Sequence, residues 1–534
     1  MPGLFPPAGG GPPYFALSRD LFLRLLGFVH LAAFASLAPQ ILGLVGAEGL
    51  MPAAAYLDRA YEIWGSAAYH DLPTLLWLWP SDGFLVGTCW LGMALSAAAM
   101  AGVAPRAVFP ALWVCYLGLT VAGQDFLVFQ WDALLLEAGL LASLYSPAGW
   151  RVSLGTGGEP AAAARWLVWG LAFKLTFLSG ATKLLSGDAT WRGMTALEHH
   201  YQTQPLPTWI GWYAHNAPDW FGTLSVGVMF VIEIAVPFAI LAPARFRRIR
   251  ITGCGLLCLL QALIAATGNY GFFNLLAVVL YLSLLDDAAV ARLLRLGALG
   301  RLPGPAVQTP GRVGRAAIGA EGDGSRTGAA MMRNPPRRAP GWRWWARAAV
   351  TALLAVLSTL ALIREVRAPA PMPAWADVLL DDWAGPFRSV NGYGLFRVMT
   401  TERPEIVIEG SADGSTWLEY PFGWKPGDPA RAPRFALTHM PRLDWRMWFA
   451  ALDPRGNSHW LLPLAEGLLE DDPAALGLLD GTPFPDGPPR FVRLMLYRYR
   501  FTTREEGADG AWWAREPLGP LTEPLTGRVD ALTR

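Results

Sequence analysis

Nine apolar runs, most of them close to 20 residues long, constrain the fold of this 534-residue chain more than any other feature. They cover residues 21–44, 84–103, 107–123, 126–146, 164–185, 223–243, 251–267, 270–285 and 348–363. A helix needs about 20 apolar residues to cross about 30 Å of hydrocarbon, where its backbone groups must bond to one another. The third, seventh and eighth runs are short. We therefore predict a polytopic α-helical membrane bundle of eight or nine spans.

Composition supports this class and bears on the partners. Charged residues make up 16% of the chain, against about 25% in an average soluble protein. The net charge of +1 gives no general attraction for a polyanion. We therefore expect the lipid bilayer as a partner and no nucleic acid.

Arginines are distributed unevenly between the loops. If nine spans alternate from an inside N-terminus, one side receives almost all the loop arginines: Arg19, Arg24, Arg106, Arg151, Arg165 and those in 245–250 and 288–347. Arg59 is the exception, in a loop rich in acidic residues. The positive-inside rule then places the arginine-rich side in the cytoplasm and the C-terminal part outside it.

Composition shifts divide the chain into five parts. We predict a disordered N-terminus (1–19), a transmembrane helical domain (20–285), an Arg/Gly/Pro-rich cytoplasmic linker (286–345), a last transmembrane helix (346–365) and an extracytoplasmic β-rich domain (366–534). In that domain, residues 405–410 and 491–501 have strand patterns, and 445–452 and 460–479 have helical spacing. These patterns are typical of a soluble β-sandwich-like domain with a helical insertion, although an open sheet fits them as well.

A set of polar residues lies within the predicted spans, where each charge costs about 2.5–3.5 kcal/mol and needs a partner or a role. The set comprises Gln130, Asp132, Glu137, Lys174, Lys183 and Glu233. Two hypotheses account for it. The charges either pair between helices and hold the bundle together, or they line a cavity that handles protons or a ligand. The sequence does not show which acid faces which lysine.

The loop after the fifth run is dense in aromatic residues and histidine. It carries Trp191, Glu198, His199 and His200, followed by further Trp and Tyr residues typical of a membrane interface. The spacing matches no zinc motif. Cys254 and Cys258 could hold a metal at i,i+4 spacing, but no His or acid flanks them, which favours packing. G-x-S-x-G, P-loop and G-x-G-x-x-G patterns are also missing, which excludes the commonest soluble enzyme classes. We predict no metal and no cofactor, and we interpret the loop as a lid on the membrane surface.

Several segments resemble the lipase maturation factor family, in order along almost the whole chain. They are residues 129–139 (FQWDALLLEAG), 178–188 (LSGATKLLSGD), 190–192 (TWR), 200–207 (HYQTQPLP), 267–274 (TGNYGFFN), 391–397 (NGYGLFR), 409–417 (EGSADGSTW) and 483–490 (PFPDGPPR). The resemblance implies a multi-pass membrane factor, not an enzyme, that helps secreted lipases fold and assemble. Its C-terminal domain would meet the client lipase. Candidate client-binding residues in the matching motifs are Asn391, Tyr393, Asp413 and Trp417.

The location implied depends on the source of the chain. The family resides in the endoplasmic reticulum membrane of eukaryotes, and a prokaryotic member would occupy the bacterial inner membrane. Only three of the 43 basic residues are lysines. This bias toward arginine indicates a genome rich in G and C, which suggests a bacterial source. The long 288–347 linker departs from the family pattern, and a homo-oligomer remains compatible with the sequence.

A fainter similarity links the membrane part to vitamin K-dependent γ-glutamyl carboxylases. It rests on Lys183 followed by Trp191, and in that family a lysine so placed acts as a base. The alternative function is therefore a membrane enzyme acting on a protein or lipid substrate. Lys183 would be its general base, assisted by Asp132, Glu137, His199 and His200.

Overall fold

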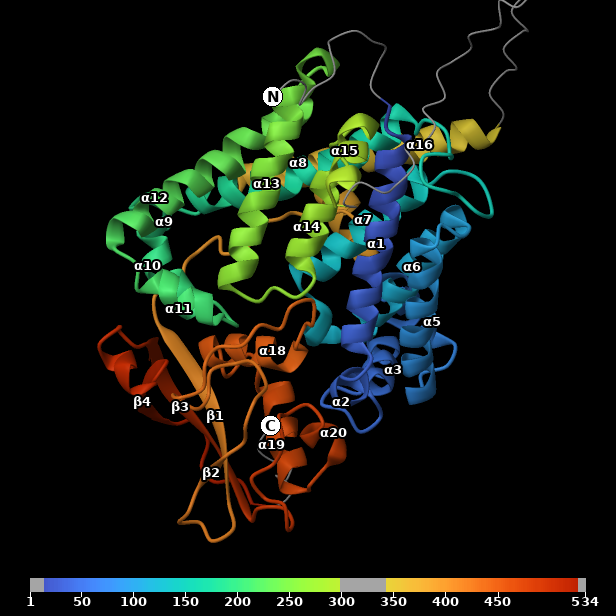
Figure 1. Ribbon diagram of the computed structural model, residues 1–534. Coiled ribbons are helices and arrows are strands. Elements are labelled where there is room, and N and C mark those ends of the chain that lie inside the picture. The colour runs from blue at the N-terminus through green and yellow to red at the C-terminus, as the bar shows by residue number, and fades with distance from the viewer. Residues whose placement is uncertain (1–13, 298–341, 527–534) are drawn as a thin grey trace, which may run out of the picture.

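The computed structural model describes residues 14–297 and 342–526. It has two parts, a helical bundle and a C-terminal region built around one small sheet (Figure 1). The predicted N-terminal segment and linker lie largely outside the described residues. Within the described part, the first helix begins at Ala16, inside the range predicted to be disordered, and it contains the buried ion pair of Arg19 and Asp20.

Helices account for the whole of the first part. Their bounds are α1 Ala16–Leu37, α2 Ile41–Val45, α3 Ala53–Trp64, α4 Ala68–Asp71, α5 Asp82–Met100, α6 Pro105–Ala122, α7 Gln130–Tyr145, α8 Ala162–Leu185, α9 Ala189–Arg192, α10 Ala196–Thr203, α11 Trp209–His215, α12 Asp219–Phe230, α13 Arg247–Thr267, α14 Phe273–Leu282, α15 Asp287–Gly297 and α16 Trp342–Arg367. After α12 the helix continues as a π-helical stretch, Val231–Ala235, and a 3₁₀ stretch, Val236–Leu241.

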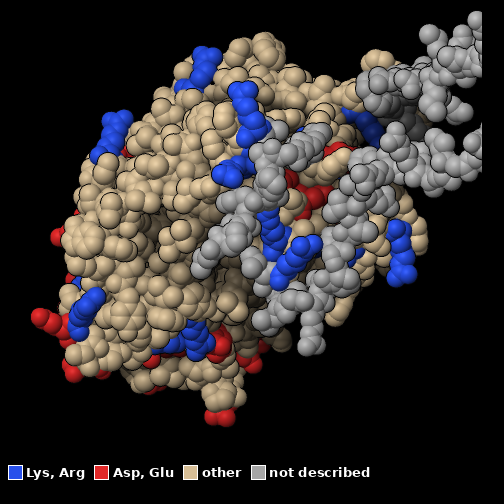
Figure 2. Space-filling model, turned by 45° about the horizontal axis from the view of Figure 1, so that its top comes forward, with Lys and Arg blue, Asp and Glu red and all other residues tan. Residues whose placement is uncertain are grey.

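Six helices of the described part are long and apolar enough to cross a membrane. They are α1, α5, α6, α12 with its continuation to Leu241, α13 and α16. The other three predicted runs fall on α7, with 16 residues, on α14, with ten, and on α8. α8 has 24 residues, but Arg165, Lys174 and Lys183 lower its hydropathy. Figure 2 shows the surface that results, with broad areas almost free of charged side chains.

The two ends of the bundle differ in chemistry. At one end, here called the basic end, Arg19 donates to Gly158 O at 2.9 Å, Arg24 to Val152 O and Arg106 to Ser146 O. At the other end, the sheet end, the residues after α1 meet the C-terminal region, where Gln40 donates to Met440 O. The helices α1, α5, α6 and α7 run alternately between these ends, and the short helices α2–α4 lie at the sheet end (Figure 1).

The C-terminal region holds a four-stranded antiparallel sheet in the order β2-β1-β3-β4. Its strands are β1 Arg403–Ser411, β2 Leu418–Glu419, β3 Phe491–Phe501 and β4 Trp513–Pro520. The helices of this region are α17 Ala374–Asp377, α18 Arg442–Leu452, α19 Ser458–Leu469 and α20 Pro473–Leu476. The predicted strands and the helical insertion between β2 and β3 are thus confirmed.

The expected sandwich is not formed in the described part of the chain, because helices cover both faces of the single sheet. Ile406, Ile408 and Leu494 belong to the large core that includes α18 and α19. On the opposite face, Val407 and Phe501 pack with Trp212 of α11. A strand buried on both faces needs two covering layers, and here one of them comes from the membrane part.

Candidate functional site

The intramembrane acid Asp132 is held by an arginine of the C-terminal region. Arg442, the first residue of α18, donates from Nη1 to Asp132 Oδ2 at 2.6 Å and from Nη2 to Oδ1 at 2.8 Å. The Tyr116 hydroxyl of α6 donates to Oδ1 at 2.5 Å. Both charged side chains are 1% exposed. This is a bidentate, charge-assisted contact, the strongest kind available between two side chains.

Glu137 lies further along α7 than Asp132, and it bonds to α8 and to the segment that leads into the sheet. Lys174 of α8 donates to its Oε1 at 2.6 Å. The Tyr393 hydroxyl donates to Oε2 at 2.7 Å, and the backbone N–H of Asn391 donates to the same oxygen at 3.2 Å. The carboxylate therefore ties two membrane helices to the segment that leads into the sheet.

Lys183 pairs with Glu233 in the π-helical stretch, with Nζ at 2.7 Å from Oε2 and 3.1 Å from Oε1. Its Nζ also lies 5.2 Å from the ring centre of Trp191, and the Trp191 indole donates to Phe396 O at 2.9 Å. Each charged member of the predicted polar set thus has an opposite charge. The set forms two internal pairs, and Asp132 makes a third pair with Arg442 from outside the set, so there is no single cluster. Gln130 is in none of these pairs.

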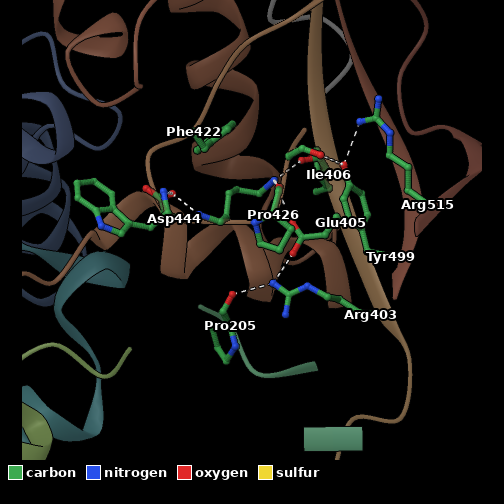
Figure 3. Close-up of polar contacts among 12 residues, drawn as sticks. Pro205, Arg403, Glu405, Ile406, Phe422, Pro426, Asp444, Tyr499 and Arg515 are labelled. Atoms are coloured by element: carbon green, nitrogen blue, oxygen red, sulfur yellow. Dashed lines mark hydrogen bonds and ion pairs between the residues drawn. The ribbon is translucent and has the colours of Figure 1, made fainter. Parts of the chain in front are cut away.

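A second buried network fixes the sheet to the loop after α10 (Figure 3). Arg403 at the start of β1 donates to the carbonyl oxygens of Gln202, Gln204 and Pro205. It also pairs with Glu405 at 2.6 Å, and Glu405 lies 3.0 Å from Lys425 Nζ. All three charged side chains are almost fully buried. The ion pairs lie within the C-terminal region, whereas the bonds from Arg403 to the three carbonyl groups form only when the sheet is docked on the helices.

Further contacts hold the chain around Lys425. Asp444 of α18 accepts hydrogen bonds from the backbone N–H groups of Trp424 and Lys425. Burial nonetheless raises the pKa of the Asp444 carboxyl. The Tyr499 hydroxyl donates to Gly427 O and accepts a bond from Arg515 (Figure 3). These contacts fix the strand–loop–helix geometry behind the docked face.

The histidines of the α10 loop do not form an acid–base pair with the intramembrane carboxylates. The His200 ring packs edge-on against Phe396 at 4.6 Å, and its Nε2 lies 3.2 Å from the Tyr270 hydroxyl. Burial, and secondarily the charge of Lys183, lowers the pKa of His200 to about 3, so the ring is neutral at pH 7. The His199 carbonyl accepts a bond from Thr203. No three His, Cys, Asp or Glu side chains converge on a metal-sized site in residues 14–297 and 342–526.

The predicted client-binding residues separate into two groups. Tyr393 is 1% exposed and its hydroxyl donates to Glu137, so its side chain offers no surface to a partner. The Asn391 side chain is half-buried and donates to Arg388 O at 3.0 Å. Asp413 and Trp417 lie in the turn between β1 and β2, and Asp413 is exposed. Its Oδ1 accepts bonds from Ser411 Oγ and from the N–H groups of Ser415 and Thr416. These backbone bonds lower the pKa of Asp413.

Sequence reasoning missed Arg442 and Arg403, and it did not predict the bond from the Tyr393 hydroxyl to Glu137. Both arginines lie in a region with the composition of a soluble domain, and nothing near them in the chain shows that their partners come from the membrane part. One signal in the sequence could have indicated a distant cation: α7 carries the acids Asp132 and Glu137 but no lysine or arginine.

Comparison with known proteins finds two matching family profiles and several similar proteins. Residues 17–292 match the profile described as "Lipase maturation factor transmembrane domain" and 389–522 the one described as "Lipase maturation factor C-terminal domain". The chain is 36% identical to Lipase maturation factor 2 of Gallus gallus over 95% of this chain and 81% of the relative. It is 36% identical to Lipase maturation factor 2 of Homo sapiens (94% and 81%) and 34% identical to Lipase maturation factor 1 of Bos taurus (96% and 89%). No solved structure matches the chain.

Fold and interface together define a multi-pass membrane protein whose C-terminal region is docked on its helices through buried charges. Both matched profiles and the full-length relatives identify its group. The chain belongs to the lipase maturation factor family.

The Asp132–Arg442 pair generates a stability prediction. Asp132→Asn or Arg442→Met alone strands a buried partner, and we expect each to cost about 3–5 kcal/mol of unfolding free energy. The double variant should recover part of the loss. The measurement is unfolding of the full chain in detergent micelles.

The matched control is Arg498→Met, which breaks half-exposed ion pairs with Glu516 and Glu402. We expect it to change stability by about 1 kcal/mol or less. Losses that simply add in the Asp132/Arg442 double variant would contradict the pairing.

Proposed function

We propose that this chain is a membrane-bound maturation factor that helps secreted lipases, or similar clients, to fold and assemble. Family membership supports the client class, since the relatives carry the name lipase maturation factor. The observation that carries the proposal is the pairing of every charged candidate residue within the helices. Paired charges supply a rigid scaffold for the C-terminal region, whereas an acid–base enzyme needs a group free to exchange its proton.

The client surface proposed here is the β1–β2 turn with the adjoining face of β3. In Figure 1 this turn lies at the end of the molecule farthest from the helical bundle. Trp417 is half-buried there under the Arg493 guanidinium, which lies 3.9 Å from its ring centre. Arg493 in turn pairs with Glu409 at 2.7 Å. A rigid aromatic residue beside an arginine is a composition typical of binding hot spots.

The client surface is tested by co-expressing a secreted lipase with the full chain and measuring lipase activity per amount of lipase secreted. Trp417→Ala should lower this ratio, because loss of an aromatic hot spot costs about 2 kcal/mol of binding, roughly thirtyfold in affinity. Leu437→Ala, at another exposed site of the same region, serves as the control and should behave as wild type. Equal lipase activity with both variants would reject this surface.

A second candidate function, the membrane enzyme with Lys183 as base, draws support from the proximity of Lys183 to Trp191. Lys183→Arg distinguishes the two, because arginine can keep the ion pair to Glu233 but stays protonated at any working pH. We expect this variant to retain lipase maturation near the wild-type level in the same co-expression assay. Loss of maturation in a well-folded, normally expressed Lys183→Arg protein would favour chemistry in the membrane.

We further propose that eight or nine of the helices that carry the apolar runs cross the membrane, with the domain boundaries predicted from the sequence. The basic end would then be cytoplasmic, and the sheet end would face the periplasm or the lumen of the endoplasmic reticulum. The concentration of Arg19, Arg24 and Arg106 at the basic end supports this orientation. The host membrane is the inner membrane in a bacterium and the endoplasmic reticulum membrane in a eukaryote.

Reporter fusions test the orientation. A reporter active only outside the cytoplasm should work when fused after Arg534, and a cytoplasmic reporter should work when inserted near Gly322. If the two insertion sites prove to lie on the same side of the membrane, α16 does not cross it.

A further inference from the structure

A cavity of about 350 Å³ lies at the sheet end between the start of α7, the end of α16 and the segment 380–392. Its apolar lining includes Leu127, Val128 and Leu380, of which Val128 is 53% exposed and the other two are buried. The polar lining includes two arginines, Arg364 and Arg388. The cavity therefore combines apolar and cationic side chains, as a lipid site does.

The two arginines differ in what neutralises them. Arg364 pairs with Asp381 at 2.6 Å. Arg388 donates from Nη1 to Thr120 O at 2.8 Å, and no carboxylate of the described part lies within ion-pair distance of it. Asp132, which also lines the cavity, is committed to Arg442. A half-buried guanidinium with unused N–H donors favours an anion, and phosphate matches its geometry.

The backbone around Arg388 is held in place. Arg388 has φ of +48°, in the left-handed region that non-glycine residues seldom adopt. Phe387 stacks on Trp113 of α6 at 6.2 Å between ring centres, and the Trp113 indole donates to Ser389 Oγ at 2.8 Å. A residue fixed in an uncommon conformation by its neighbours on both sides is typical of a binding site.

The cavity continues into an open groove of about 780 Å³, which shares Asp381, Gly385 and Arg388 with it. The groove brings in Asp71, Asp382, Trp383 and His70, whose ring lies 6.2 Å from that of Trp383. Carboxylates and aromatic faces attract an ammonium group. The three aspartates near the mouth also disfavour a ligand with net negative charge.

The location of the groove matches the depth of lipid headgroups. It lies beside the sheet ends of α6 and α16, which both fulfil the length and composition of a membrane span. Trp383 is 66% exposed, and Trp79, in the loop that follows α4, is 69% exposed. Exposed tryptophans at the ends of spanning helices mark the membrane–water interface.

We propose that this cavity and groove bind a zwitterionic phospholipid, with its phosphate on Arg388 and its ammonium group toward Asp382 and Asp71. An acyl chain lies over Val128, the exposed member of the apolar lining. The lipid joins α7 and α16 to the segment that leads into the sheet.

The test measures thermal unfolding of the full chain in detergent with four added probes. These are phosphatidylethanolamine, phosphatidylglycerol with the same acyl chains, free phosphoethanolamine and inorganic phosphate. A ligand that binds only the folded state raises the melting temperature with its concentration. We expect phosphatidylethanolamine to stabilise the wild type most, and Arg388→Gln to weaken its apparent affinity at least about tenfold, through loss of a charge-assisted contact.

Two further variants complete the design. Asp382→Asn changes an exposed side chain and should reduce the preference for phosphatidylethanolamine over phosphatidylglycerol, even if Arg388→Gln fails to fold. Arg434→Gln, an exposed arginine paired with Asp480, is the matched control and should respond as wild type. Equal stabilisation by free phosphoethanolamine or by phosphate would overturn the lipid assignment. An unchanged lipid response in both Arg388→Gln and Asp382→Asn would overturn the site.

Discussion

A charge buried among membrane helices must be neutralised, and this constraint determines how the two parts of the chain are joined. Asp132 finds its counter-ion in Arg442, 310 residues further along the chain. Without that arginine, the buried carboxylate would lose its bidentate counter-ion, at a cost of several kcal/mol. The bond therefore fixes α18, and with it one covering layer of the sheet, against α7. The C-terminal region is thus a continuation of the membrane fold and not an independently tethered domain.

Local patterns predicted most of the individual elements. The alternation over residues 491–501 gave β3 with its observed bounds, and the helical spacing near 460–479 became α19 and α20. Local patterns could not predict what covers the sheet. The apolar face around Val407 and Phe501 looks like half of a sandwich, and only the folded chain shows that Trp212 from α11 fills that place. A strand pattern specifies that a face is buried but not which kind of element buries it.

The same distinction applies to the site. The cost of burying a charge singled out Asp132, Glu137, Lys174, Lys183 and Glu233 from sequence alone. Their pairing depends on helix rotation and on residues outside the spans, so Lys174 with Glu137 and Lys183 with Glu233 became visible only in three dimensions. Tyr393 shows the opposite error. Its motif suggested a contact with another protein, yet its hydroxyl satisfies Glu137 inside the fold. A motif can therefore record a structural contact as readily as a functional one.

Docking by buried charges has a consequence for how the C-terminal region can act. Arg403 donates to the carbonyl oxygens of residues 202, 204 and 205. Arg442 bonds to the carboxylate of Asp132, and Tyr393 bonds to that of Glu137. Swinging the sheet away from the bundle would expose all of these groups at once, so a large hinge motion is energetically excluded. The β1–β2 turn is consequently held at a fixed distance from the bundle. For the same reason, removing residues 368–534 would strand Asp132 and would take the Tyr393 and Asn391 bonds from Glu137, which keeps Lys174. A loss of activity in such a truncation would therefore reflect the helices as well as the missing surface.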